Sequence, residues 1–190
     1  MVKNFFVFVL ELLKIIIISL VIIIPVRYFL IQPFYVKGAS MEPNFFDSEY
    51  LIIDEITYRF HEPMRGDIIV FRYPKEPQEY YIKRIIGLPG EEVQIKDGGI
   101  TIYSSTNPEG SILHENYLDP NLKTNSLTQE KISLSEKEYY VLGDNRNQSK
   151  DSRSFGPVDK SFIIGRVLFR GWPFNRVTVF ETPQYSPAIN

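Results

Sequence analysis

Two patterns of apolar residues divide the chain. Residues 5–24, FFVFVLELLKIIIISLVIII, form a nearly continuous apolar run that only Glu11, Lys14 and Ser19 interrupt. A helix of about 20 residues is about 30 Å long, which matches the hydrocarbon core of a bilayer. The run therefore predicts a transmembrane helix, and we expect residues 1–31 to form a single-pass membrane anchor.

A cleavable signal peptide is the alternative interpretation of this segment. The apolar core of a signal peptide usually has about 7–15 residues, which is shorter than this run. The small residues Gly38, Ala39 and Ser40 follow downstream, but Lys37 lies where a cleavage site would carry a small residue. These features favour a permanent anchor. Basic residues lie on both sides of the run, so the positive-inside rule does not decide its orientation.

Beyond the anchor, short runs of β-branched and aromatic residues alternate with turn signals such as Leu-Pro-Gly-Glu (88–91). Such runs are typical of strands. Nine strands are predicted, at 34–36, 50–54, 67–73, 80–86, 92–95, 100–103, 138–144, 162–169 and 177–180. No long amphipathic helix separates them, so residues 32–190 are expected to form a mainly β domain, as a barrel or as paired sheets. Residues 104–135 are polar and weakly periodic, and we interpret them as an insertion or extended loop.

Composition excludes several classes of function. The 190 residues include 21 Lys and Arg against 23 Asp and Glu, and no basic stripe suggests nucleic acid as a partner. No cysteine is present, which excludes disulfides, thiolate zinc sites and cysteine nucleophiles. His61 and His114 are isolated and lack the spacing of a metal site or of a histidine-based triad. We therefore expect no metal, no cofactor and no nucleic-acid partner.

Ser40 and Lys83 are the candidate catalytic residues. Ser40 lies between small residues and a Met-x-Pro turn in VKGASMEPNFF (36–46). In the predicted strand 80–86, alternation places Lys83 between Tyr81 and Ile85 on one face. An apolar site lowers the pKa of a lysine, and a neutral lysine can act as the base for a serine hydroxyl. The ordinary alternatives are a serine in a loop and a lysine that extends from a strand edge to solvent.

Residues 143–156, GDNRNQSKDSRSFG, are rich in hydrogen-bonding groups. The segment begins like a calcium loop, but Ser149 stands where glycine is required and Phe155 where glutamate is required. Calcium binding is therefore not expected. The alternative is a polar turn held by ion pairs, namely Asp144 with Arg84 and Asp151 with Arg153.

Four blocks of the sequence resemble the type I signal peptidases. They are Gly-x-Ser-Met-x-Pro (38–43), Arg-Gly-Asp-Ile-Ile-Val-Phe (65–71), Lys-Arg-Ile-Ile-Gly-Leu-Pro-Gly-Glu (83–91) and Gly-Asp-Asn-Arg-x-x-Ser-x-Asp-Ser-Arg (143–153). The resemblance covers about residues 30–180 apart from 104–135. It implies a serine endopeptidase of the cell membrane, with its β domain on the extracytoplasmic face. Such enzymes remove signal peptides from exported preproteins, so preproteins and the lipid bilayer are the implied partners.

The resemblance also implies roles for individual residues. Ser40 matches the nucleophile, Lys83 the general base, and Ser149 a hydroxyl that orients the lysine amine. The residues that match site-supporting ion pairs are Arg84, Asp144, Asp151 and Arg153. Gly38 occupies a position where some family members have a serine that completes the oxyanion hole, so only the Ser40 N–H is assigned as an oxyanion donor.

The substrate is expected to bind as an extended strand, with alternate side chains entering shallow pockets. We expect these pockets to be walled by Val36, Met41, Tyr81 and Ile82, with Gly38 leaving room for the substrate backbone. Cleavage is then predicted after Ala-x-Ala-like sequences. A non-catalytic membrane-anchored β adaptor is the rival function, and it would not require Ser40. A self-cleaving repressor with a similar dyad would need a DNA-binding domain, which residues 1–31 do not provide.

Overall fold

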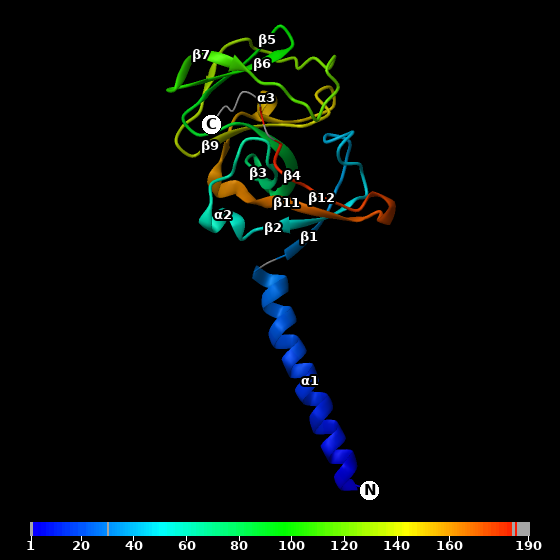
Figure 1. Cartoon of the computed structure of the whole chain (residues 1–190). Coiled ribbons are helices and arrows are strands. Elements are labelled where there is room, and N and C mark those ends of the chain that lie inside the picture. Colours follow the sequence, from blue (N-terminus) through cyan, green and yellow to red (C-terminus); the bar gives the residue numbers. More distant parts are fainter. Residues whose placement is uncertain (1, 30, 184, 186–190) are drawn as a thin grey trace.

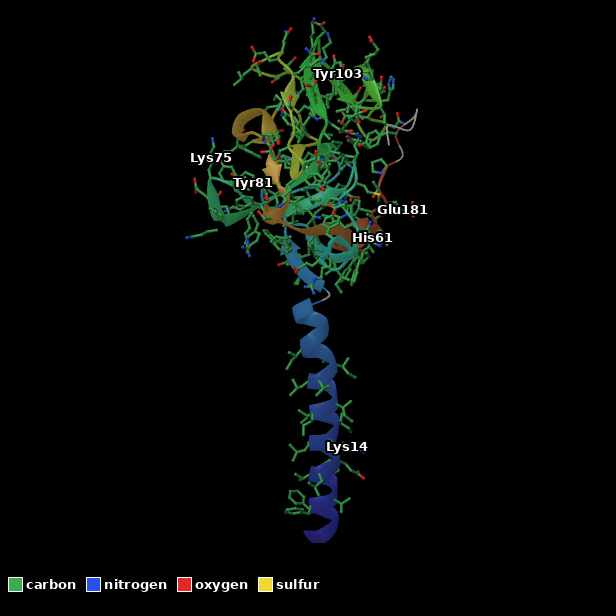
Figure 2. All side chains as sticks on the ribbon, turned by 90° about the vertical axis from the view of Figure 1, so that its left-hand side faces the viewer. Lys14, His61, Lys75, Tyr81, Tyr103 and Glu181 are labelled. Carbon is green, nitrogen blue, oxygen red and sulfur yellow. The ribbon has the colours of Figure 1, made fainter. Side chains whose placement is uncertain are left out.

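A computed structural model of the chain describes residues 2–29, 31–183 and 185 (Figure 1). Helix α1 (Val2–Phe29) extends away from a β-rich body, and strand β1 (Ile31–Tyr35) continues from it. Within α1, the stretch Phe5–Ile24 is long and apolar enough to cross a membrane, and none of it is buried against the rest of the described chain. Figure 2 shows Lys14 on this isolated part of the helix. The predicted fold class, an apolar N-terminal helix followed by a mainly β domain, is confirmed.

The larger of two antiparallel sheets lies nearest to α1 (Figure 1). Its strand order is β1-β2-β11-β3-β4-β9-β10, and β12 pairs with β11. The strands after β1 are β2 (Tyr50–Asp54), β3 (Ile68–Tyr73), β4 (Glu76–Gly87), β9 (Glu138–Leu142), β10 (Val158–Asp159), β11 (Ile163–Trp172) and β12 (Thr178–Val179). Four short helical turns connect them: α2 (Thr57–Phe60), α3 (Ser152–Phe155), η1 (Lys160–Phe162) and η2 (Phe174–Arg176).

The smaller sheet has the order β7-β6-β5-β8 and lies at the end of the body farthest from α1, where Figure 2 labels Tyr103. Its strands are β5 (Glu92–Lys96), β6 (Gly99–Ser104), β7 (Asn107–Ile112) and β8 (Ile132–Ser133). The stretch 104–135 therefore contributes two strands, β7 and β8, and turns between them. Neither strand is among the nine that the hydrophobic pattern predicts.

Strand β4 lies between two parts of the hydrophobic core. Tyr81 and Ile85 pack with the cluster that contains Phe71, whereas Ile82 packs with the cluster that contains Val70. These contacts confirm the alternation predicted for Tyr81, Ile82 and Ile85, whereas Ile86 packs in a third cluster with Val93 and Leu142.

One edge of β4 has no strand partner along part of its length. Residues from Tyr80 to Arg84 pair with β3 in consecutive register. On the opposite edge, β9 pairs with β4 only between Arg84 and Gly87. Among the described residues, the backbone from Glu79 to Lys83 is therefore free to accept another strand on that edge.

Candidate active site

Ser40 lies in a turn that follows β1, and several backbone contacts hold this turn. The N–H of Glu42 donates to the carbonyl of Ala39 over 3.2 Å, and the N–H of Phe45 donates to that of Met41 over 2.9 Å. Asn145 fixes the turn from the opposite side: its N–H donates to the Ser40 carbonyl over 3.1 Å, and its side-chain amide donates to the Ala39 carbonyl over 3.1 Å. The position of the Ser40 hydroxyl is thus set by main-chain contacts on both sides.

Gly38 enters this turn with φ at +90°, a conformation that residues with a side chain rarely adopt. Its N–H donates to the Asp47 carboxylate over 2.7 Å. A serine at position 38 would therefore be strained in this backbone, which gives a physical reason for glycine at this position.

The amine of Lys83 contacts the hydroxyl of Ser40. The Lys83 Nζ–Ser40 Oγ distance is 2.7 Å, and the same amine donates to the Ile82 carbonyl over 2.7 Å. Lys83 is only 3% exposed. Burial disfavours the ammonium and lowers the pKa of Lys83 from its usual 10.5 to about 8, although the carboxylates of Asp151 and Asp144 oppose this shift. A substantial fraction of Lys83 is therefore neutral in mildly alkaline solution.

The two carboxylates are themselves paired with arginines. Arg84 donates to both oxygens of Asp144, over 2.9 and 2.7 Å, and Asp144 is completely buried. Asp151 accepts from Arg153 over 2.8 Å and from the N–H of Gly143 over 3.1 Å. The structure thus brings together both predicted ion pairs beside Lys83, and their mutual neutralisation leaves burial as the main influence on the pKa of the lysine.

Ser149 lies next to this site but does not contact the lysine in the expected way. Its hydroxyl is buried and has no hydrogen-bond partner within the described part of the chain. A Cβ added to Gly143 would come within 2.1 Å of the Ser149 Oγ and 2.4 Å of the Ser40 carbonyl, so only glycine fits between them. The amine of Lys83 is oriented by the carbonyl of Ile82. The role that the resemblance implies for Ser149 remains a prediction.

A cleft of about 590 Å³ opens at Ser40 and Lys83 and follows the free edge of β4. Its lining residues are Lys37, Gly38, Ala39, Ser40, Glu79, Tyr80, Tyr81, Ile82, Lys83, Gln148 and Lys150. Figure 2 labels Tyr81 within the β-rich body, between α1 and the smaller sheet. The lining includes three predicted substrate-contacting residues, Gly38, Tyr81 and Ile82.

Val36 and Met41 have a different location from the one expected. They are 4% and 1% exposed, and both pack into the core cluster with Phe45 and Leu51. Their closeness to Ser40 in sequence suggested cleft walls, but their side chains point into the core. They lie outside the lining of the cleft and support the turn that carries Ser40.

Four polar residues near the site, Asn44, Asn145, Arg146 and Lys150, have no separate role predicted from the sequence. Asn44 donates to Asp144 over 2.8 Å, and Arg146 is a buried arginine. The ammonium of Lys150 lies 4.4 Å from the centre of the Tyr73 ring, on the cleft wall. Asn145 and Arg146 belong to the quoted block 143–153, but side-chain periodicity carries no signal for such loop contacts.

A mainly β domain with a serine hydroxyl against a buried lysine suits a peptidase that uses lysine as its base. Comparison with known proteins specifies the family. The model of the family "Signal peptidase, peptidase S26" matches residues 9–172. The chain therefore belongs to the signal peptidase family, peptidase S26, which is a family of serine peptidases.

Two relatives in particular agree with this assignment. A probable signal peptidase I-2 of Synechocystis sp. is 36% identical, over 95% of this chain and 81% of the relative. A signal peptidase I of Bacillus licheniformis is 37% identical, over 88% of this chain and 90% of the relative. The crystal structure of a signal peptidase I from Enterococcus faecalis V583 is 32% identical and covers 56% of this chain and 97% of that chain, with a TM-score of 0.45.

Proposed function

We propose that this protein is a membrane-anchored serine endopeptidase that removes N-terminal signal peptides from exported preproteins. Family membership and the names of the relatives support the reaction class. The observation that carries the proposal for this chain is the 2.7 Å contact between the Ser40 hydroxyl and the amine of a buried lysine, Lys83.

The chemistry follows from this contact. Neutral Lys83 accepts the hydroxyl proton while the Ser40 Oγ attacks the scissile carbonyl carbon, forming a tetrahedral intermediate. The resulting ammonium returns the proton to the leaving amine, the C–N bond breaks, and an acyl-Ser40 ester remains. Water then attacks this ester: Lys83 takes a proton from the water, returns it to the Ser40 Oγ, and releases the signal peptide as a carboxylic acid.

The backbone N–H of Ser40 is the proposed donor to the oxyanion. This N–H makes no hydrogen bond to an acceptor in the described part of the chain, so it is available for a ligand. The N–H of Gly38 is engaged by Asp47. Stabilisation of the oxyanion by one backbone donor is worth roughly a hundredfold or more in rate.

The free edge of β4 supports the proposed mode of substrate binding. An extended peptide can pair with the backbone from Glu79 to Lys83 as an added strand. This pairing places the scissile bond beside Ser40, because Lys83 lies at the end of the free segment and holds the Ser40 hydroxyl. Substrate side chains at the cut and two residues before it share one face of the added strand, so both enter the same side of the cleft, where bulky neighbours such as Ile82 would favour small side chains.

Helix α1 supports the proposed location. Phe5–Ile24 exposes an apolar surface along its whole length, and a bilayer would remove this surface from water. We assign α1 as a single-pass anchor and the β domain, which begins at Ile31 and not at the predicted residue 32, as the catalytic domain on the extracytoplasmic face where signal peptides emerge. β1 begins at Ile31, two positions after the last residue of the helix, so the connection between the membrane and the cleft domain is short.

Cleavage of a secretory precursor by the full chain in detergent tests the proposal. Ser40→Ala and Lys83→Ala should each abolish cleavage while the variants stay folded, because each removes one of the two reacting groups. More than a few per cent of the parent activity in either variant would refute the dyad. An adaptor without chemistry, the rival function, would be indifferent to Ser40→Ala and would leave the precursor intact in every case.

A further inference from the structure

One buried ion pair connects the stretch 104–135 to the loop beside the active site. The carboxylate of Glu115 accepts from both terminal nitrogens of Arg146, with a distance of 2.6 Å between Nη1 and Oε2. The side chain of Arg146 is 1% exposed and that of Glu115 is 12% exposed. Arg146 also donates to the hydroxyl of Thr124. Solvent screens such a pair little, so it can fix geometry far better than a surface ion pair.

The same guanidinium holds the loop that packs against Ser40. Arg146 Nε donates to the carbonyl of Gly143 over 3.0 Å. The Ser40 carbonyl and the Ser149 hydroxyl lie so close to Gly143 that no side chain would fit at this position. The next residue, Asp144, binds Arg84, and the N–H of Asn145 donates to the Ser40 carbonyl. Arg146 thus anchors a loop whose members contact the turn of the nucleophile.

Other contacts join the two segments at the same place. The ring of Tyr117 lies 3.8 Å from the guanidinium carbon of Arg84, and its carbonyl accepts from Asn44. Arg153 donates to the carbonyl of Asn125 over 3.0 Å. Three arginines of the site are therefore held by residues 115–125, although this stretch lies outside the cleft lining.

We infer that Glu115 and Arg146 are positioning residues of the peptidase site, which fix the loop 143–146 and through it the distance between Ser40 and Lys83. This inference rests on the proposed function. It gives the stretch 104–135 a role: its residues 115–125 complete the support of the site from the side of the smaller sheet.

A displaced loop should change catalysis in two ways. Misplacement of reacting groups by about 1 Å can cost about a hundredfold in rate. A loosened 143–146 loop also admits water to the amine of Lys83. The other groups around this amine are the Ser40 hydroxyl, the Ile82 carbonyl, the Tyr81 ring with Lys150 beyond it, and the carboxylates of Asp144 and Asp151. Water relieves the desolvation of the ammonium, so the pKa of Lys83 rises from about 8 toward 10.5.

The test uses the full chain in detergent and three variants: Glu115→Gln, Arg146→Met and the double variant Glu115→Leu/Arg146→Met. Each single variant should lower kcat by about 10- to 100-fold with little change in KM. The pH of half-maximal activity should also move upward. The double variant leaves no unpaired buried charge and should fold as well as the parent, yet remain as impaired in kcat as the single variants.

Glu92→Gln is the matched control, because Glu92 pairs with Lys131 at 3.5 Å on the exposed face of the smaller sheet. It should leave both readouts unchanged.

The double variant decides the result even if a single variant does not fold. Parent-like kcat and pH dependence in the folded double variant would show that the ion pair serves stability alone. The pKa of Lys83, measured by NMR on isotope-labelled lysine, separates this inference from the proposed function. A raised pKa in the double variant supports positioning even if no precursor is cleaved, whereas an unchanged pKa contradicts it. Loss of cleavage in Ser40→Ala supports the proposed function independently of the results for the Glu115 and Arg146 variants.

Discussion

Replacing Lys83 by methionine tests the central electrostatic feature of the site, a buried amine that is costly to protonate. The pKa of Lys83 is about 8 in the folded protein against 10.5 for an unperturbed lysine. Because the folded-state pKa is depressed, the unfolded chain binds the proton more tightly, and protonation destabilises the folded state below pH 8. This penalty is relieved as pH rises from about 8 to 10.5. The full difference corresponds to about 3.4 kcal/mol, at about 1.36 kcal/mol for each pH unit.

Linkage then gives the size of the effect in a practical pH range. Between pH 7 and pH 10, the parent protein should gain about 2.5 kcal/mol of unfolding free energy relative to Lys83→Met. All other titrating groups are common to both proteins and cancel in the comparison. Urea unfolding in one detergent, followed by fluorescence of Trp172, measures this difference, since Trp172 is the single tryptophan. If the difference in unfolding free energy between the parent and Lys83→Met stays constant within about 0.5 kcal/mol from pH 7 to pH 10, the Lys83 amine is not desolvated.

Three other predictions concern the same group of residues. The value of kcat/KM should rise with pH and reach half of its maximum near pH 8, and Lys83→Arg should be inactive because arginine stays protonated. Asp144→Asn should lower the unfolding free energy by about 3 kcal/mol, since Arg84 is left without its buried counter-ion, whereas Glu62→Gln in an exposed pair should change it by less than about 1 kcal/mol. A urea unfolding midpoint of Asp144→Asn equal to that of the parent would contradict the predicted loss of stability. Ser149→Ala should lower kcat without loss of stability, because the Ser149 hydroxyl has no partner among the described residues; unchanged kcat would remove Ser149 from the mechanism.

Runs of apolar, β-branched and aromatic residues predicted most of the fold: β2, β5 and β6 bury alternate residues, whereas β3 and β9 are buried over nearly their whole length. The apolar run 5–24 predicts α1, and the alternation around Lys83 predicts that Tyr81 and Ile85 share a face. Strand β7 was not predicted, because its sequence, NPEGSI, contains proline and glycine and has little strand propensity. It forms because β6 offers a paired edge, which is a tertiary effect that a local pattern does not carry.

The candidate site was predictable where a residue type is chemically unusual in its context. Lysine within an apolar strand is such a case, and the structure places Lys83 against Ser40. Val36 and Met41 were expected in the cleft only because they are near Ser40 in sequence, and the turn directs them into the core. The pair between Glu115 and Arg146 joins residues 31 positions apart, and a single sequence gives no sign of such a contact.

N-terminal sequencing of a cleaved precursor is the decisive test of whether Ser40 cleaves signal peptides after Ala-x-Ala. The full chain in detergent is mixed with an exported preprotein that carries Ala-x-Ala before its mature region, and with a second form that has leucine at the cut. The proposed function predicts one new N-terminus, directly after the second alanine, with little product from the leucine form and none from Ser40→Ala. Cleavage elsewhere, equal rates for both forms, or the same product from Ser40→Ala would contradict it.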